Sequence, residues 1–325
     1  MPSVQKLHID KPLTNISIGY KNEAYISDQV FPAVPVNKQS DRYYVYGMER
    51  FRQHDDLRAP GSEANEIGWD LSLDTYYTEG HALRHAIADE EKQNADDEFD
   101  LEAEATELVT EGILLNKEVD AANKVLDPDN YHTDLKVTAW GGSGQPKKWS
   151  DFSGSDPIGD IAKAKQAMHG LSGIRPNTLI ISETVLNVLL LHPAIKEIIK
   201  YVQPGLITVD LLRTVFGVDR ILVGSALKST VTNPGQAVPG QRDELNYIWG
   251  NSAVLAYITP RPARKSVSMG YTFMWNKDGQ GAVQVRKWYE VARRATVIEA
   301  ERWYAHKFIS NVCAFLFQDC VDPLA

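Results

Sequence analysis

The feature that most constrains this chain is a long acidic amphipathic helix, predicted over residues 98–126. Its small and apolar residues are spaced alternately four and three apart: Leu101, Ala105, Leu108, Gly112, Leu115, Val119, Ala122 and Leu126. This spacing is typical of a helix that lies along a partner surface. Residues 90–124 hold twelve acidic and three basic residues, an excess of nine that equals the formal net charge of −9 of the whole chain.

Charge and composition exclude several classes of protein. The net charge of −9 argues against general nucleic-acid binding, which needs clustered Lys and Arg. The two cysteines, Cys313 and Cys320, match no metal or redox spacing and form no disulfide framework, so we expect a reducing cytoplasm. The N-terminus has no apolar signal region, and no apolar run approaches the roughly 20 residues of a membrane span. We therefore expect no membrane partner.

The first 78 residues have almost no helical period. Residues 1–40 are predicted to form an extended arm, because prolines at 12, 32 and 35 interrupt them. A frayed terminus is the ordinary alternative, but the apolar content of the arm favours docking on another surface.

Residues 41–78 predict a β-hairpin whose returning limb carries Ile67, Trp69, Leu71 and Leu73 on one face. A two-stranded ribbon is marginal in water, so this hairpin should lean on another surface, such as another subunit.

The rest of the chain predicts a compact α/β unit and a long C-terminal strand. We expect a helix over 157–169 with Ser155 or Asp156 as its cap. The α/β unit has predicted strands at 178–181, 220–224, 247–249 and 253–258, and predicted helices at 183–192, 194–201 and 209–216. Residues 295–317 alternate with few turn residues and predict one strand of more than twenty residues.

No catalytic constellation stands out. His81 and His85 lie four residues apart, but a zinc site needs a third ligand in a closed pocket. The glycine-rich loop at 141–144 is not followed by a helix as a phosphate-binding loop requires. Ser225 and Lys228 have the Ser-x-x-Lys spacing without the other elements of that catalytic set. We expect no metal and no cofactor.

In order and spacing, the chain resembles the major capsid proteins of tailed bacteriophages, which have the Hong Kong-97-type fold. The phrases that carry the resemblance are Pro176–Thr184, Phe216–Ser225, Ile248–Ala253 and Glu299–Ala305. The resemblance implies an α+β fold with an N-terminal arm (1–40), an extended loop (41–78), a peripheral domain (79–175) with a spine helix at 98–126, an axial domain (176–262) and a return to the peripheral domain (263–325).

The resemblance also implies the function. The chain should assemble as hexamers and pentamers into an icosahedral head shell around double-stranded DNA, in the cytoplasm of a bacterial host. A separate scaffolding protein and a portal protein are implied partners, a decoration protein is a further candidate, and contact with the packaged DNA should be non-specific. Some relatives crosslink a Lys to an Asn, but no such pair is matched here.

We expect contacts between copies at the hairpin and the acidic helix. The candidate residues are Arg42, Arg50, Arg52, Arg58 and Trp69 of the hairpin, and Glu98, Glu102 and Glu107 of the helix. Gly112 is a candidate bend point during shell expansion, and its alternative role is a close helix contact. Two other functions stay open: an α/β enzyme with a site in 176–258 formed by His192, Asp210 or Arg213, and a phage decoration or tail protein.

Overall fold

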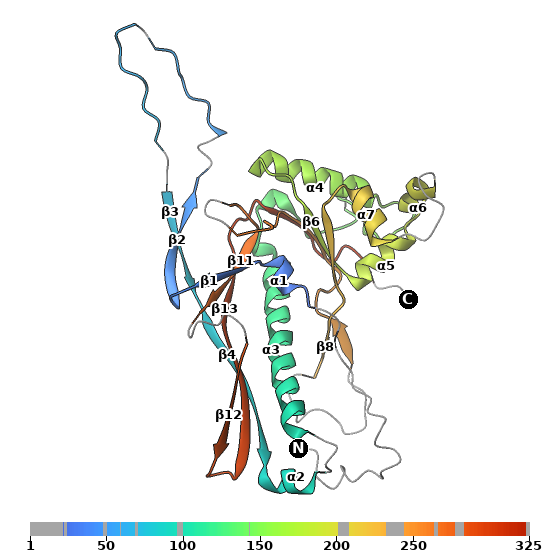
Figure 1. Ribbon diagram of the computed structural model, residues 1–325. Coiled ribbons are helices and arrows are strands. Elements are labelled where there is room, and N and C mark those ends of the chain that lie inside the picture. The colour runs from blue at the N-terminus through green and yellow to red at the C-terminus, as the bar shows by residue number, and fades with distance from the viewer. Residues whose placement is uncertain are drawn as a thin grey trace.

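The computed structural model describes residues 22, 25–47, 51–58, 60–68, 71–95, 100–142, 144–200, 208–231, 244–262, 266–276 and 283–322. The chain forms an elongated body with a long hairpin projecting from it (Figure 1). The model is mixed helix and sheet, as predicted. Among the described residues, no helix combines the length and apolar content needed to cross a bilayer.

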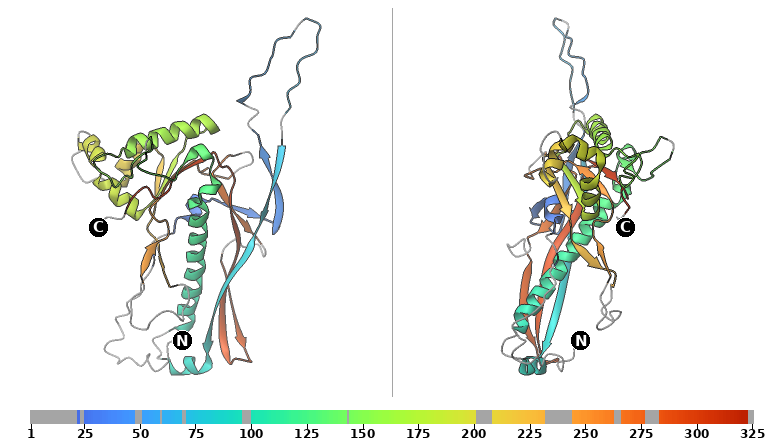
Figure 2. Two further views of the ribbon diagram at one scale, coloured as in Figure 1. Left: turned by 180° about the vertical axis from the view of Figure 1, so that it is seen from behind. Right: turned by 90° about the vertical axis from the view of Figure 1, so that its right-hand side faces the viewer.

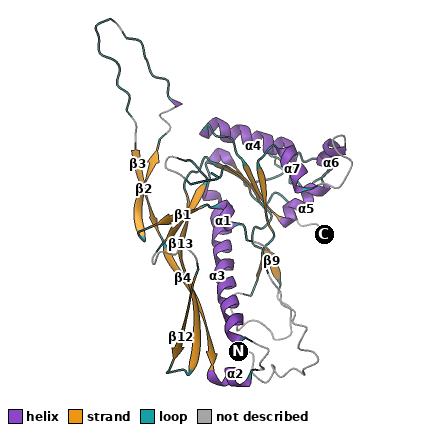
Figure 3. Cartoon of the chain, viewed as in Figure 1, coloured by secondary structure: helices purple, strands orange, loops and turns teal. Residues whose placement is uncertain are grey.

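The elongated part of the molecule is built on strand β13 (Ala295–Phe308). Its neighbours are β4 (Glu79–Ala88) on one side and, on the other, β11 (Gly270–Trp275) and β12 (Gln284–Glu290) at successive positions along its length; β1 (Ala33–Val36) extends the sheet beyond β11. The first three pairings are antiparallel, whereas β1 runs parallel to β11. Helix α3 (Leu101–Leu126) lies along this sheet, as Figure 3 shows, and α2 (Asp89–Asn94) precedes it.

A second sheet forms the compact part. Its strands, in spatial order, are β5 (Lys136–Val137), β14 (Ala314–Phe317), β10 (Ala253–Ala256), β6 (Thr178–Ser182) and β7 (Arg220–Gly224). Four helices belong to this part: α4 (Pro157–Ser172), α5 (Glu183–Leu191), α6 (Pro193–Lys200) and α7 (Val209–Phe216). They gather around the second sheet (Figure 1). Both faces of β6 are buried, because Leu179 and Ile181 meet the helix side while Ile180 meets the core around α1 (Ser27–Val30) and α3.

Local sequence signals explain the helix ends. Asp156 accepts a hydrogen bond from the Gly159 N–H and starts α4, and Ser182 accepts one from the Val185 N–H and starts α5. Gly217 ends α7 in the left-handed conformation at φ 57°, which glycine adopts without steric cost. Asp100 caps α3, and two short 3-10 turns (Pro128–Asn130 and Thr133–Leu135) follow it.

The predicted stripe of the acidic helix is only partly right. The residues of α3 that are buried are Ala105, Val109, Ile113, Lys117, Glu118, Ala121, Ala122 and Val125. Leu108, which the stripe placed inward, is 62% exposed. The main buried row repeats every four residues, so it drifts by about 40° around the helix at each step. The drift follows the neighbours of α3, because its first half packs against Ile87 and Ile298 and its second half packs against the core around α1.

The predicted C-terminal strand is wrong in one respect, because it is two strands in two different sheets. β13 ends at Phe308, and residues 309–313 turn the chain before β14 begins at Ala314. Ser310 and Asn311, which favour turns, lie at the break, where the Cys313 N–H bonds the Ser310 carbonyl at 3.3 Å. The predicted strand at 247–249 is also displaced: β9 (Leu245–Tyr247) pairs with β8 (Leu227–Ser229), and a turn follows at 248–251.

Gly270 lets the N-terminal segment approach β13 closely. A Cβ at this position would lie 2.5 Å from the backbone oxygen of Lys307 and closer still to the ring of Phe31. We expect Gly270→Ala to lower the free energy of unfolding by about 1–3 kcal/mol, since a backbone oxygen cannot rotate away. Urea unfolding of the variant measures this loss. Gly170→Ala is the matched control, because a Cβ there meets no atom within 4 Å.

Candidate assembly surfaces

The stem of the projecting hairpin, β2 (Ser40–Tyr46) and β3 (Leu71–Tyr77), has one face anchored to its own subunit. The ring of Phe273 lies 4.5 Å from Tyr76 in a stacked arrangement and 5.6 Å from Tyr43. The Tyr43 hydroxyl donates to Asp74, whose carboxylate also pairs with Lys307 at 3.2 Å. Burial of the ring and the carboxylate of Asp74 raise the pKa of Tyr43, so this hydroxyl stays a donor at neutral pH.

The opposite face of the stem is apolar and exposed. Tyr44 and Leu73 are directly opposite each other across the two strands, and they are 57% and 52% exposed. Leu71 and Tyr77 continue the same face at 43% and 60% exposed. We call Tyr44, Leu71, Leu73 and Tyr77 the outer stem face. An exposed apolar surface of this kind is typical of a site of protein–protein contact, and contact with another copy stays a prediction.

The ring of Phe51 lies beside Gly173 at the end of α4, and the rest of the hairpin beyond the stem projects from the body in both views of Figure 2. Phe51, Leu57 and Ile67 are 70%, 86% and 62% exposed. The region 41–78 holds eight acidic and four basic residues, so the hairpin as a whole is acidic. The hairpin and the acidic helix therefore both carry a net negative charge. Their net charges predict no overall attraction, so any attraction would have to come from individual arginine–carboxylate pairs.

The predicted contact residues have different surroundings. Arg42, Arg52 and Arg58 are exposed on the hairpin, where the Arg58 side chain donates to the Ser62 carbonyl at 2.6 Å. Glu107 is exposed on α3. The structure does not bring these arginines together with the acidic helix within one subunit, and pairing between copies stays a prediction. Arg50, Trp69 and Glu98 lie outside the described residues.

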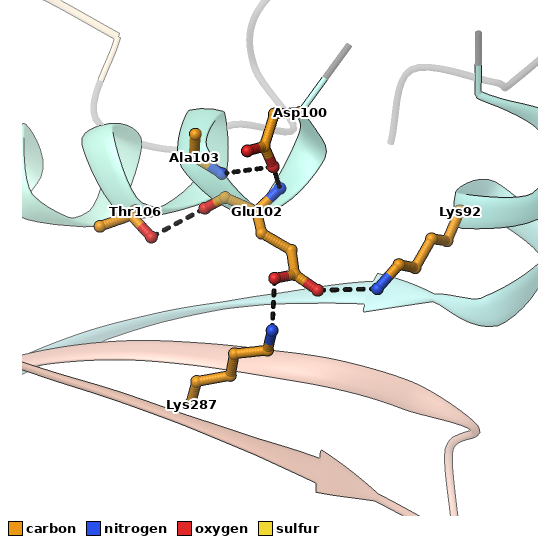
Figure 4. Close-up of polar contacts among 6 residues, drawn as sticks. All are labelled: Lys92, Asp100, Glu102, Ala103, Thr106 and Lys287. Carbon is orange, nitrogen blue, oxygen red and sulfur yellow. Dashed lines mark hydrogen bonds and ion pairs between the residues drawn. The ribbon is translucent and has the colours of Figure 1, made fainter. Parts of the chain in front are cut away.

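Glu102 is bound within its own chain (Figure 4). Its carboxylate pairs with Lys92 at 2.7 Å and with Lys287 of β12. Hydrogen bonds from Lys287 and Lys92 lower the pKa of Glu102. The carboxylate therefore connects the start of α3 to α2 and to β12. Glu102 could pair with a neighbouring copy only by sharing its carboxylate with these two lysines.

Gly112 lies at a close helix–strand contact. A Cβ there would come 2.8 Å from the side chain of Leu83 on β4. This geometry fits the alternative role of a small residue at a packed crossing. Its role as a bend point during expansion stays a prediction.

A buried carboxylate on α3 holds the N-terminal segment, which the sequence did not reveal. Glu118 is 0% exposed and accepts hydrogen bonds from three donors: the Ile26 N–H at 3.1 Å, the Ser27 N–H at 2.8 Å and the Trp249 indole at 2.7 Å. The adjacent Lys117, also buried, pairs with Asp28. Burial would raise the pKa of Asp28, but the Lys117 ammonium holds it below its usual value. The predicted arm is thus bound to its own subunit from residue 25 to residue 36.

His306 is buried beneath this segment, between aromatic rings and near two lysine ammonium groups. It is 2% exposed, its ring centre is 5.3 Å from Phe31 and 5.1 Å from Tyr304, and its Nδ1 meets the Thr272 hydroxyl at 2.8 Å. Burial, with the ammonium groups of Lys117 and Lys124, lowers the pKa of His306 to about 3. The ring is neutral in the folded protein at ordinary pH.

We therefore expect acid to destabilise the folded subunit through His306. The unfolded chain binds a proton at this ring below its ordinary pKa of about 6.5, whereas the folded chain binds it only near pH 3. Between these values the unfolded state holds more protons, so each unit of pH below 6.5 costs up to about 1.4 kcal/mol. Urea unfolding between pH 7 and pH 4.5 measures this slope. His306→Gln should give a shallower slope, and an unchanged slope would contradict the assignment.

The residues considered for an enzyme have structural partners. His192 is 1% exposed; its Nδ1 accepts from the Ala194 N–H at 3.2 Å, so its Nε2 carries the proton that faces Ser155 at 3.0 Å. A histidine in this tautomer cannot accept a proton from that serine. Asp210 and Arg213 form an exposed pair with each other at 3.7 Å. His81 stacks on Tyr304, and the described residues contain no group of three or more metal-ligating side chains.

Comparison with known proteins gives the family. The major capsid protein of Burkholderia phage BcepMu is 32% identical over 293 residues, which cover 88% of this chain and 89% of that relative. The chain belongs to the phage major capsid proteins. The major capsid protein of Pseudomonas phage JBD67 is 28% identical over 279 residues, 85% of each chain. No family model matches the capsid chain.

Solved structures confirm the Hong Kong-97-type fold of the capsid subunit. A phage-related protein of Bordetella bronchiseptica RB50 superposes with a TM-score of 0.68 at 25% identity, covering 93% of this chain and 94% of that one. The capsid of cyanophage P-SCSP1u gives 0.63 at 10% identity, covering 97% and 93%. The capsid subunit is a structural protein of the virion shell, and the prediction from sequence resemblance is confirmed.

Proposed function

We propose that this major capsid protein assembles as hexamers and pentamers into the icosahedral head shell that encloses the double-stranded DNA of a tailed bacteriophage. The observation that carries the proposal is the two-faced hairpin. Its inner face is fixed to the subunit by Phe273 and Lys307, while its outer stem face is apolar and exposed. Such a face gains about 25 cal/mol for each Å² of apolar area that a neighbouring copy covers, before ordering costs.

The predicted division into arm, extended loop, peripheral domain and axial domain is kept as part of the proposal. Its support is the pair of sheets, with one qualification: the second sheet takes β5 and β14 from outside residues 176–262. We keep a separate scaffolding protein, a portal protein, assembly in the bacterial cytoplasm and a purely structural, non-enzymatic role as expectations. Pairing of Arg42, Arg52 or Arg58 with Glu107 of another copy is also kept, at about 0–1 kcal/mol for each exposed pair.

Electron microscopy tests the proposal directly. The expressed protein, alone or with a co-expressed scaffold, should form closed shells or capsomers. A species that stays monomeric under all of these conditions would contradict it. Deleting residues 58–65 removes loop residues that are exposed wherever the structure describes them, so circular dichroism should be unchanged while the yield of shells falls. Normal assembly of the deletion variant would refute the role of the hairpin.

A further inference from the structure

A hollow lined by basic side chains lies on the compact part of the subunit, between α4, the segment that follows it and the end of α7. Its volume is about 350 Å³. We call it the α4–α7 hollow, and the residues that line it are Lys165, Gln166, His169, Arg175, Pro176 and Gly217. The whole chain has a formal net charge of −9, so a surface that gathers these three basic residue types differs from the rest of the subunit. A concave basic surface attracts carboxylates and other anions.

Two of the basic side chains in the hollow are open to a partner. The ammonium group of Lys165 is fixed at the end of α7, where it donates to the Gly217 carbonyl at 2.7 Å and to the carbonyl of the residue before it. Burial lowers the pKa of Lys165, and the carboxylate of Asp219 opposes this effect. Arg175 and His169, in contrast, are exposed. Their side chains can therefore bind an anion that comes from outside the subunit.

The loop of the projecting hairpin has the opposite charge. Residues 53–68 hold four Asp or Glu and one Arg. The four acidic residues are all exposed, and they are Asp55, Asp56, Glu63 and Glu66. Within one subunit, the described residues form no ion pair between these carboxylates and the α4–α7 hollow. The acidic loop and the basic hollow therefore complement each other without meeting in the same chain.

The hairpin and the hollow lie at the same end of the molecule. In Figure 1 and in both views of Figure 2, α4 and the hairpin lie at the end of the body that is opposite to α2. The hairpin meets its own α4 at Phe51 and Gly173, and the loop beyond Phe51 projects from the body. When two copies lie side by side in the same orientation, the loop of one copy is at the level of the hollow of the other.

We propose that the acidic hairpin loop of one copy docks at the α4–α7 hollow of an adjacent copy, where its carboxylates pair with Arg175 and His169. This inference rests on the proposed function, because it needs copies that assemble side by side. It names the surface that receives the hairpin, and it explains how an acidic hairpin serves assembly in an acidic subunit. Exposed ion pairs contribute little affinity each, so these pairs mainly fix the position and the partner of the loop.

Charge reversal on both sides tests the contact. Gln166→Glu together with Arg175→Glu reverses the hollow, and Asp56→Lys together with Glu63→Lys reverses the loop. Each pair of substitutions should lower the yield of shells about tenfold, because like charges then face each other. All four side chains are exposed, so each variant should fold, and circular dichroism checks this. A chain that combines both reversals should regain most of the yield, because opposite charges face each other again.

The matched control is Lys163→Glu. This side chain is on the same helix, is 81% exposed and lies outside the hollow, so its reversal should leave the yield unchanged. Two reversed variants that fail without rescue in the combined chain would overturn the proposal, since the hollow would then receive a different anion. A normal yield from either reversed variant would overturn it as well. A wild-type chain that forms no shells would contradict the proposed function itself, and this inference with it.

Crosslinking in assembled shells identifies the copy that provides the loop. Shells are assembled from a mixture of two chains, one with Arg175→Cys and one with Glu63→Cys, and a short bismaleimide is added. The native Cys313 and Cys320 are 0% exposed and should not react. Denaturing electrophoresis should show a crosslinked dimer from the mixture, and little of it when Lys163→Cys replaces Arg175→Cys.

The remaining outcomes of the crosslinking contradict the docking. A mixture that yields no dimer, or as much dimer with Lys163→Cys, would show that the loop does not lie at the hollow. A chain that carries both Arg175→Cys and Glu63→Cys gives a third result. If this chain yields mainly a faster-migrating looped monomer, the hairpin folds back on its own subunit and the proposal is wrong.

Discussion

Replacing Glu118 by alanine should lower the free energy of unfolding by about 3–5 kcal/mol, which is among the largest effects of any single substitution in this subunit. The carboxylate is fully buried and accepts from the backbone of Ile26 and Ser27 and from the indole of Trp249. Its removal leaves three buried donors without an acceptor, each at a cost of about 1–3 kcal/mol. Urea unfolding of the unassembled subunit measures the loss.

Two variants separate this bonding role from a general effect of charge. Glu104→Ala removes an exposed acidic residue from the same helix and should change stability by less than about 0.5 kcal/mol. Glu118→Gln keeps one oxygen acceptor, so it should fall between the wild type and Glu118→Ala. If Glu118→Ala unfolds at the same urea concentration as Glu104→Ala, the three hydrogen bonds do not hold the N-terminal segment.

The double variant Leu71→Asp/Leu73→Asp should abolish shell formation while leaving the subunit folded. Both side chains lie on the outer stem face, 43% and 52% exposed in the isolated subunit. Two carboxylates there cost the free subunit little but would have to be desolvated against a neighbour, at several kcal/mol for each contact. Electron microscopy and sedimentation measure assembly, and circular dichroism measures folding.

The inner face of the same stem provides the contrast. Tyr76 is 8% exposed and stacks on Phe273, so Tyr76→Ala should lower the melting temperature of the subunit itself. A double aspartate variant that still forms normal shells would show that the outer stem face is not an assembly surface. A double variant that unfolds would show that this face contributes to the subunit core.

The elements that the sequence predicted correctly are those with local signals. Asp156, one of the two residues predicted to cap α4, does cap it, and Ser182 and Gly217 mark the start of α5 and the end of α7 by the same kind of local chemistry. The long strand was misjudged because an alternating pattern cannot report that the chain changes sheets at Ser310 and Asn311. A periodic pattern of apolar residues indicates which side chains are buried, but it does not indicate which strand or helix covers them.

The burial of Lys117 and Glu118 could not be predicted either, because it too depends on neighbours that are distant in the sequence. Lys117 and Glu118 look like surface residues of an acidic helix, and only their three-dimensional neighbours show that both are buried. The one available signal was their position: Lys117 continues the four-residue row of Val109 and Ile113. A charged residue in an otherwise apolar row indicates a buried ion pair or a buried hydrogen-bond network.

The N-terminal segment also has a consequence for the order of events during synthesis. Its partners are distant in sequence: the Ile26 N–H bonds Glu118, 92 residues away, Asn22 bonds Leu227, 205 residues away, and the Phe31 carbonyl accepts from Thr272, 241 residues away. The N-terminal segment leaves the ribosome early, but it cannot dock until Leu227 and Thr272, near the other end of the chain, have been synthesised. Contacts of such long separation form slowly. A nascent chain consequently cannot complete its core, and so cannot present a finished subunit to other copies, until its synthesis is almost over.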